Sequence, residues 1–145
     1  MKLWLQIAVA LSLSVGGVLG AMAIFHRGPD NAPEDKFRFV SGNPMLTDGM
    51  ALLVQRTTIQ LSGIEMNSSP DALAASKAYL AQVGAVNCYE SADGWSCSAI
   101  EGRNNLAEVL VLSGLARTTS SASKQLIEAE EFARTNGKGI WRIAR

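Results

Sequence analysis

A long uncharged segment near the start of the sequence is the feature that most restricts how this chain can fold. From Leu3 to Phe25 no side chain carries a charge, and most are apolar. A helix of about 20 apolar residues can cross the hydrocarbon core of a bilayer. Residues 1–27 are therefore predicted to be an uncleaved membrane anchor or a cleaved signal sequence. Small residues at 18–20 and 21–23 offer cleavage sites, and a buried core helix is the third possibility.

Residues 28–35 contain two prolines and several turn formers, and they are predicted to be a linker. The globular domain then covers residues 36–145. The whole chain has 13 basic and 13 acidic side chains, so removing Lys2 and Arg27 leaves a slightly acidic remainder. Proteins that bind nucleic acid usually present a basic face, because each neutralised phosphate adds affinity. The composition therefore argues against a nucleic-acid partner.

Local signals in the domain alternate between strands and helices. Strands are predicted at 37–40, 51–54 and 57–64, and a hairpin from 86–89 and 95–100. Helices are predicted where a capping residue precedes an apolar pattern and glycine or asparagine follows it: from Ser69 to Gly84, over 105–112, and from Ser121 or Ser123 to Thr135. Interleaved strands and helices with short connections indicate an α+β domain.

The two cysteines, Cys88 and Cys97, lie at equal distances from the predicted hairpin turn at Ala92–Asp93. On a two-stranded hairpin they would be directly opposite each other, with Cβ atoms about 4.5–5.5 Å apart. That separation permits a disulfide after a modest adjustment. Two buried free thiols are the alternative. The single histidine, His26, precedes the domain, so these residues cannot supply a typical four-ligand zinc site.

Several segments of the domain are similar to one protein family. They are a strand-like segment, the region of the predicted short helix and the C-terminal block: Ile59–Glu65, Asn105–Glu108, Leu112–Ala116, Leu126–Arg134 and Gly139–Trp141. Over residues 37–141 the chain resembles the staphylococcal-nuclease-like (thermonuclease) family. The resemblance implies a five-stranded OB-type β-barrel that carries three helices. Most of the matching positions concern packing, so they indicate fold more than chemistry.

Active members of this family hydrolyse phosphodiester bonds with a calcium ion, two arginines and a glutamate. The resemblance makes Asp48, the first aspartate of the family's Asp-Gly-Asp-Thr turn, and Glu65 the weak candidates for metal binding. The other positions have lost their groups: Met50 replaces a metal-binding aspartate, Gln60 the first arginine, Ser68 the glutamate that activates water, and Gly94 the second arginine.

These substitutions remove the groups on which the family's chemistry depends, since calcium takes six to eight oxygen ligands and arginine forks match phosphate oxygens. We therefore expect a catalytically inactive binding or scaffold module without a resident cofactor, whose partner is a protein or an oligosaccharide. The alternative is a divergent calcium-dependent nuclease that uses Asp48 and Glu65. The segment 3–25 as a membrane contact and the cysteine pair favour an inner-membrane-anchored or secreted protein with a periplasmic domain.

Other prominent side chains have simple structural interpretations. Trp95 and Trp141 are expected to pack in the hairpin and the core, with stacking on a ligand as the alternative for Trp95. Three methionines either surround the former metal pocket or simply fill space: Met45, Met50 and Met66. The charged residues of the last helix are expected to form its solvated face: Glu128, Glu130, Glu131 and Arg134.

Overall fold

Five strands come first in residues 37–142, the part of the chain that the computed structural model describes, and helices are interleaved with the other three strands. The described residues belong to a compact unit that runs from Phe37 to Arg145. The predicted anchor or signal at 1–27 and the predicted linker at 28–35 lie outside them. Within 37–142 no helix has both the length and the apolar character needed to cross a bilayer.

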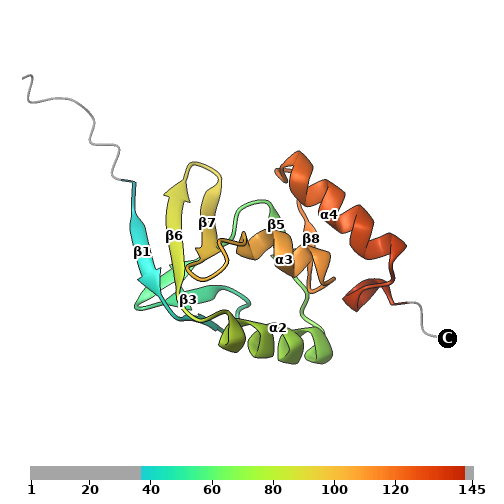
Figure 1. Cartoon of the computed structure of the whole chain (residues 1–145), viewed down its shortest axis with the longest axis horizontal. Coiled ribbons are helices and arrows are strands. Elements are labelled where there is room, and N and C mark those ends of the chain that lie inside the picture. The colour runs from blue at the N-terminus through green and yellow to red at the C-terminus, as the bar shows by residue number, and fades with distance from the viewer. Residues whose placement is uncertain (1–36, 143–145) are drawn as a thin grey trace, which may run out of the picture. The chain divides into compact units, whose positions relative to one another are not determined.

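The described residues contain eight strands, three α-helices and one short 3₁₀ helix, and the domain is α+β as predicted (Figure 1). The strands are β1 (Phe39–Gly42), β2 (Pro44–Leu46), β3 (Leu52–Val54), β4 (Thr57–Ile59), β5 (Ile64–Met66), β6 (Val86–Ser91), β7 (Gly94–Ala99) and β8 (Ala116–Thr118). The helices are α2 (Pro70–Val83), α3 (Leu106–Leu112), α4 (Lys124–Thr135) and the 3₁₀ helix η1 (Gly139–Trp141).

The strands pair into three open sheets, of order β1-β6-β7, β2-β3-β4 and β5-β8. Every pairing within these sheets is antiparallel. The ladders therefore do not form the closed five-stranded barrel that the family resemblance implied. The predicted strand at 57–64 is interrupted and divides into β4 and β5. The break covers residues 60–63. Within it, Gly63 has a φ of +74° and lies so near Ala122 that a Cβ would be 3.1 Å from the Ala122 Cα.

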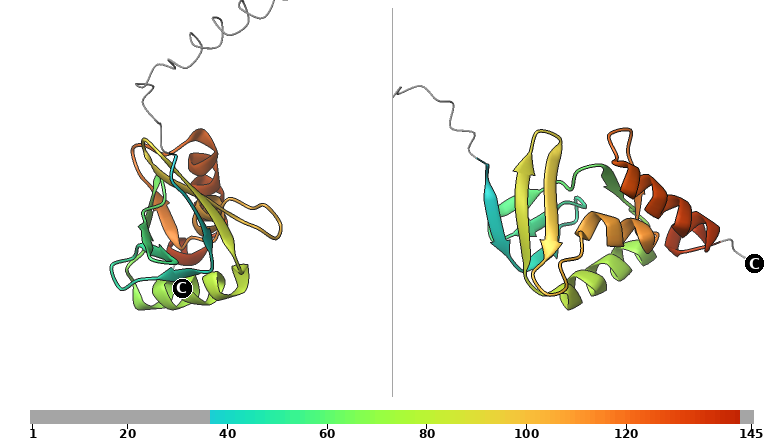
Figure 2. Two further views of the ribbon diagram at one scale, coloured as in Figure 1. Left: turned by 90° about the vertical axis from the view of Figure 1, so that its left-hand side faces the viewer. Right: turned by 45° about the horizontal axis from the view of Figure 1, so that its top comes forward.

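The helix predictions are confirmed closely because their signals are local. Ser69 caps α2 by accepting a hydrogen bond from the Ala72 amide, Pro70 is the first helical residue, and Gly84 ends the helix. Asn105 caps α3, and Ser123 caps α4. In both views of Figure 2, α2 (green) lies across one end of the strands. The orange α3 packs against β7 of the hairpin, and the red α4 packs against α3.

One hydrophobic core joins the sheets to the helices. Its fully buried large side chains come from β3, β4, β6 and α3: Leu52, Val54, Ile59, Val86, Leu106, Leu110 and Val111. The disulfide is part of this core. Cys88 and Cys97 are register partners across β6 and β7, their sulfur atoms are bonded, and both are buried. The predicted hairpin and its disulfide are therefore confirmed.

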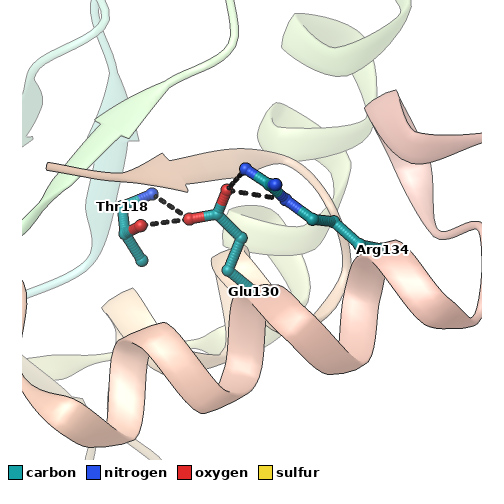
Figure 3. A network of polar contacts seen from close by, with 3 residues as sticks. All are labelled: Thr118, Glu130 and Arg134. Atoms are coloured by element: carbon teal, nitrogen blue, oxygen red, sulfur yellow. Dashed lines mark hydrogen bonds and ion pairs between the residues drawn. The ribbon is translucent and has the colours of Figure 1, made fainter.

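The interpretation of the last helix was wrong for one residue. Glu130 is only 6% exposed, and its carboxylate accepts hydrogen bonds from the amide and the hydroxyl of Thr118 in β8 and from the guanidinium of Arg134 (Figure 3). Burial by itself raises the pKa of the Glu130 carboxyl. The hydrogen bonds from Thr118 and Arg134 and the charge of Arg134 outweigh it and leave the pKa below its ordinary value. Glu130 thus ties α4 to β8.

We predict that Glu130→Gln destabilises the protein by about 1.5–3 kcal/mol at pH 7, because charge-assisted hydrogen bonds to a buried group are lost. A lowered pKa stabilises the folded state at pH values above the unfolded pKa of about 4.3, and this stabilisation is lost as the pH falls through the lower folded-state pKa. Urea unfolding at pH 7 and pH 3 measures both effects. The exposed control Glu131→Gln should change little. Equal losses for the two variants at pH 7 would contradict the role of Glu130.

We also predict that reduction of the Cys88–Cys97 disulfide lowers the free energy of unfolding by about 2–3 kcal/mol, because it releases a short loop in the unfolded chain. The measurement is the urea midpoint with and without dithiothreitol. The double variant Cys88→Ser/Cys97→Ser is the control, since its midpoint should not respond to the reductant. Identical midpoints for the oxidised and reduced wild type would show that the disulfide adds no stability.

Candidate functional site

The two acids that the resemblance suggests as metal ligands, Asp48 and Glu65, are both on the surface. Asp48 lies in the β2–β3 turn with a fully exposed side chain, and its carboxylate is 3.8 Å from the Lys77 ammonium. Glu65 is an exposed residue of β5 whose partner across the β5–β8 ladder is Arg117. Within 37–142 no three histidine, cysteine, aspartate or glutamate side chains gather as metal ligands would.

Two of the residues that the resemblance places at catalytic positions, Met50 and Gln60, line a small hollow with mainly apolar residues. Its lining residues are Met50, Leu52, Ile59, Gln60, Leu61, Ile64 and Met66. Its volume is about 10 Å³, at the lower limit of what holds a single water molecule. Met50 and Met66 are both among the residues that line this hollow. Met45, the third methionine considered, is 66% exposed and does not line the hollow.

The two positions that correspond to the family's arginines lie against each other. The Trp95 amide donates a hydrogen bond to the Gln60 carbonyl, and the Ser62 amide donates one to the Trp95 carbonyl; the nitrogen–oxygen distance is 2.9 Å in both. Gly94, next to Trp95, has a φ of +120°. A Cβ at Gly94 would be 3.2 Å from the Gln60 carbonyl oxygen and 3.4 Å from the Ser62 Cα. The closeness of these strands thus favours glycine at position 94 and leaves little room for a side chain.

Ser68, at the position of the family's glutamate, is exposed and immediately precedes the α2 cap Ser69. The hydroxyl of Ser68 forms no hydrogen bond with the described residues. It is not among the residues that line the hollow around Met50 and Gln60. The structure therefore brings Met50, Gln60 and Gly94 together, and it leaves Asp48, Glu65 and Ser68 as surface residues.

A larger cavity, not predicted from the sequence, opens beside the hairpin. It has a volume of about 260 Å³. Its lining comes from four separated stretches of the chain: Ser62, Gly63, Ser91, Asp93, Trp95, Ser96, Asn105, Ala107, Glu108, Ser121, Ser123, Gln125 and Leu126. We call it the hairpin cavity. Trp95 forms little of the cavity surface, because its side chain is only 6% exposed. The prediction that Trp95 packs within the domain at the hairpin is therefore confirmed.

The hairpin cavity is polar, and its lining contains no lysine or arginine. Some of its polar groups are already engaged. The Ser91 hydroxyl donates to the Gly94 carbonyl, while the side chains of Asn105 and Ser123 accept from helix amides. Among the described residues, no hydrogen bond or ion pair occupies the side chains of Ser62, Asp93, Ser96, Glu108 and Gln125. These hydroxyl, amide and carboxylate groups are the ones available to a ligand.

Sequence reasoning did not predict this cavity. Its serine, amide and acid residues form no recognisable motif in the sequence. A comparison with models of known protein families gives no match, and a comparison with curated proteins gives none either. The chemistry of the candidate site therefore rests on its own residues and their arrangement.

We predict that Gly94→Ala destabilises the protein by about 1–3 kcal/mol, because a Cβ would crowd the Gln60 carbonyl and the φ of +120° strains any other residue. Thermal or urea unfolding measures the change. Gly49→Ala is the matched control, since its Cβ would meet nothing closer than 3.8 Å and no positive φ is needed there. If both variants unfold at the wild-type midpoint, the strands have more room at Gly94 than we infer.

Proposed function

We propose that residues 36–145 form a staphylococcal-nuclease-like domain that has lost catalysis and serves as a binding or scaffold module. The observation that carries the proposal is the contact between Gln60 and Gly94 beside the apolar hollow of Met50 and Met66. Where the family resemblance expects two arginines and a calcium ion, this chain has close strand packing and methionine side chains.

An OB-type architecture for this domain is supported by how two of the three open sheets, β2-β3-β4 and β1-β6-β7, approach one another. The ladders run from β2 through β3 to β4, and a parallel bridge between Leu61 and Trp95 then leads to β7. From β7 the ladders continue through β6 to β1, and only Asn43 separates β1 from β2. We infer that the sheets are parts of one partly open barrel of the OB type.

The electrostatics of these positions favour the hypothesis that the domain is catalytically inactive. Removing one preorganised donor to a developing negative charge typically slows an enzyme by about 10²–10³, and removing a general base by about 10²–10⁴. Such losses are not simply additive. The resemblance expects two arginines and a general-base glutamate, and in this chain their positions are occupied by Gln60, Gly94 and Ser68. The exposed Glu65 is paired with a cation, Arg117, across the β5–β8 ladder.

The location of the domain is inferred from the disulfide and the sequence of the N-terminal segment. Disulfides such as Cys88–Cys97 persist mainly in oxidising compartments. The uncharged run from Leu3 to Phe25 has the length of a membrane span. We propose that this segment anchors the protein in the inner membrane, or directs its secretion, with the domain on the periplasmic side.

The test is a digestion assay of the purified full-length protein with plasmid DNA and with single-stranded DNA, in calcium and in excess chelator. We expect no digestion above that of buffer in either condition. Calcium-dependent digestion that disappears in Glu65→Gln but persists in Glu101→Gln, an exposed acid in the loop after β7, would overturn this proposal. That outcome would establish the divergent nuclease with Asp48 and Glu65 at its metal site.

A further inference from the structure

The outer face of the β1-β6-β7 sheet presents aromatic side chains to solvent. Phe37 is 75% exposed, and Phe39 and Tyr89 are each 52% exposed. Phe39 and Tyr89 are register partners, and their ring centroids are 4.9 Å apart. Two neighbouring aromatic rings that remain half exposed at a sheet edge form a platform on which another flat apolar surface can stack. We call Phe39 and Tyr89 the aromatic pair.

The same face carries no charged residue within the three strands. Side chains alternate between the two faces of a strand, and with Phe39 and Tyr89 outward the register places small polar or glycine residues beside them: Ser41, Asn87, Ser91, Gly94, Ser96 and Ser98. The nearest cation along β1 is Arg38, which precedes Phe39. Its guanidinium lies 3.6 Å from the Glu90 carboxylate and 5.8 Å from the Trp95 ring centroid.

The aromatic pair and the hairpin cavity adjoin each other. Tyr89 pairs directly with Ser96, and Ser91 pairs with Gly94. Both serines line the hairpin cavity. Paired residues on neighbouring strands have Cα atoms about 4.5–5.5 Å apart. One surface therefore runs from the aromatic pair across β6 and β7 into a polar cavity without a lysine or arginine in its lining.

We propose that this continuous surface binds a neutral oligosaccharide. The apolar C–H face of one sugar ring stacks on the aromatic pair, and the hydroxyl groups of a neighbouring sugar enter the hairpin cavity. There the carboxylates of Asp93 and Glu108 accept hydrogen bonds from sugar hydroxyls, and the amide of Gln125 both donates and accepts. This inference rests on the proposed function: if the domain is a binding module, its ligand is a neutral oligosaccharide.

The arrangement of charge separates this ligand from the others that an OB-type surface accepts. A nucleic acid also stacks on aromatic rings, but its binding depends on cations that neutralise phosphates. The hairpin cavity instead contains Asp93 and Glu108, which repel phosphate and carboxylate groups. Its volume of about 260 Å³ is many times the roughly 10–15 Å³ that a single water molecule needs on the same measure, and it gives room for a single sugar ring.

The experiment is isothermal titration of the full-length protein in lauryldimethylamine oxide, a detergent without a sugar headgroup. The probes are three neutral hexasaccharides: cellohexaose, maltohexaose and the hexamer of N-acetylglucosamine. We expect one of them to bind, and we expect Tyr89→Ala and Asp93→Ala each to weaken it at least about tenfold. The matched controls are Phe132→Ala and Glu131→Ala on α4, which should bind as the wild type does. Phe132 is 53% exposed, much like Tyr89.

Three results would overturn the inference. They are no binding of any of the three hexasaccharides to the folded protein, equal effects of Tyr89→Ala and Phe132→Ala, and tighter binding of an oligothymidylate or a heparin hexasaccharide than of the neutral sugars. Because Tyr89 and Asp93 are exposed surface residues, retained circular dichroism spectra are expected for their variants. The digestion assay is separate, so a nuclease activity would reject the proposed function, whereas failed titrations without nuclease activity reject only the sugar ligand.

Discussion

The pair of backbone hydrogen bonds that joins Gln60 and Ser62 to Trp95 is the interaction on which the rest of this domain depends. It connects the β2-β3-β4 sheet to the β1-β6-β7 sheet at a point where no regular ladder exists. Without it, the two three-stranded sheets would share only side-chain packing in this region. The same hydrogen bonds set how closely the β6–β7 hairpin approaches the segment that follows β4, and this distance determines which side chain fits at position 94.

The hairpin itself is held from two sides. The Cys88–Cys97 disulfide joins its strands inside the core, and α3 covers it next to β7, where Asn105 forms a bridge to Ser98. At the other end of the domain, Glu130 links α4 to β8, and Arg134 also lies 4.2 Å over the Trp141 ring. Trp141, a residue of the 3₁₀ helix, is partly buried beside α4 and is not one of the residues of the hydrophobic core. Polar contacts fix the periphery, while apolar packing fixes the centre.

Sequence reasoning succeeded where a few adjacent residues decide the outcome. Ser69, Asn105 and Ser123 accept hydrogen bonds from amides two or three residues away, so their helices could be placed from the sequence. The strands β5 and β8 have three residues each and pair only with each other, although α2, the hairpin and α3 lie between them in the chain, and no local pattern reveals such a pairing. The same holds for the hairpin cavity, whose lining comes from separated segments. Glu130 was recognisable in principle, because Leu126, Ala129 and Ala133 mark the buried stripe of α4 on which it lies.

The close fit at Gly94 has a consequence for the history of this fold. If the domain descends from a phosphodiesterase, a single substitution at position 94 would restore the missing arginine only with strain, because its Cβ would lie 3.2 Å from the Gln60 carbonyl oxygen and the φ there is +120°. The hairpin would first have to lengthen or move away, and until it did so a new arginine would bring only strain. Loss of activity at this position would then be easy to reach in one step and hard to reverse, and selection would be left to act on the surfaces around it.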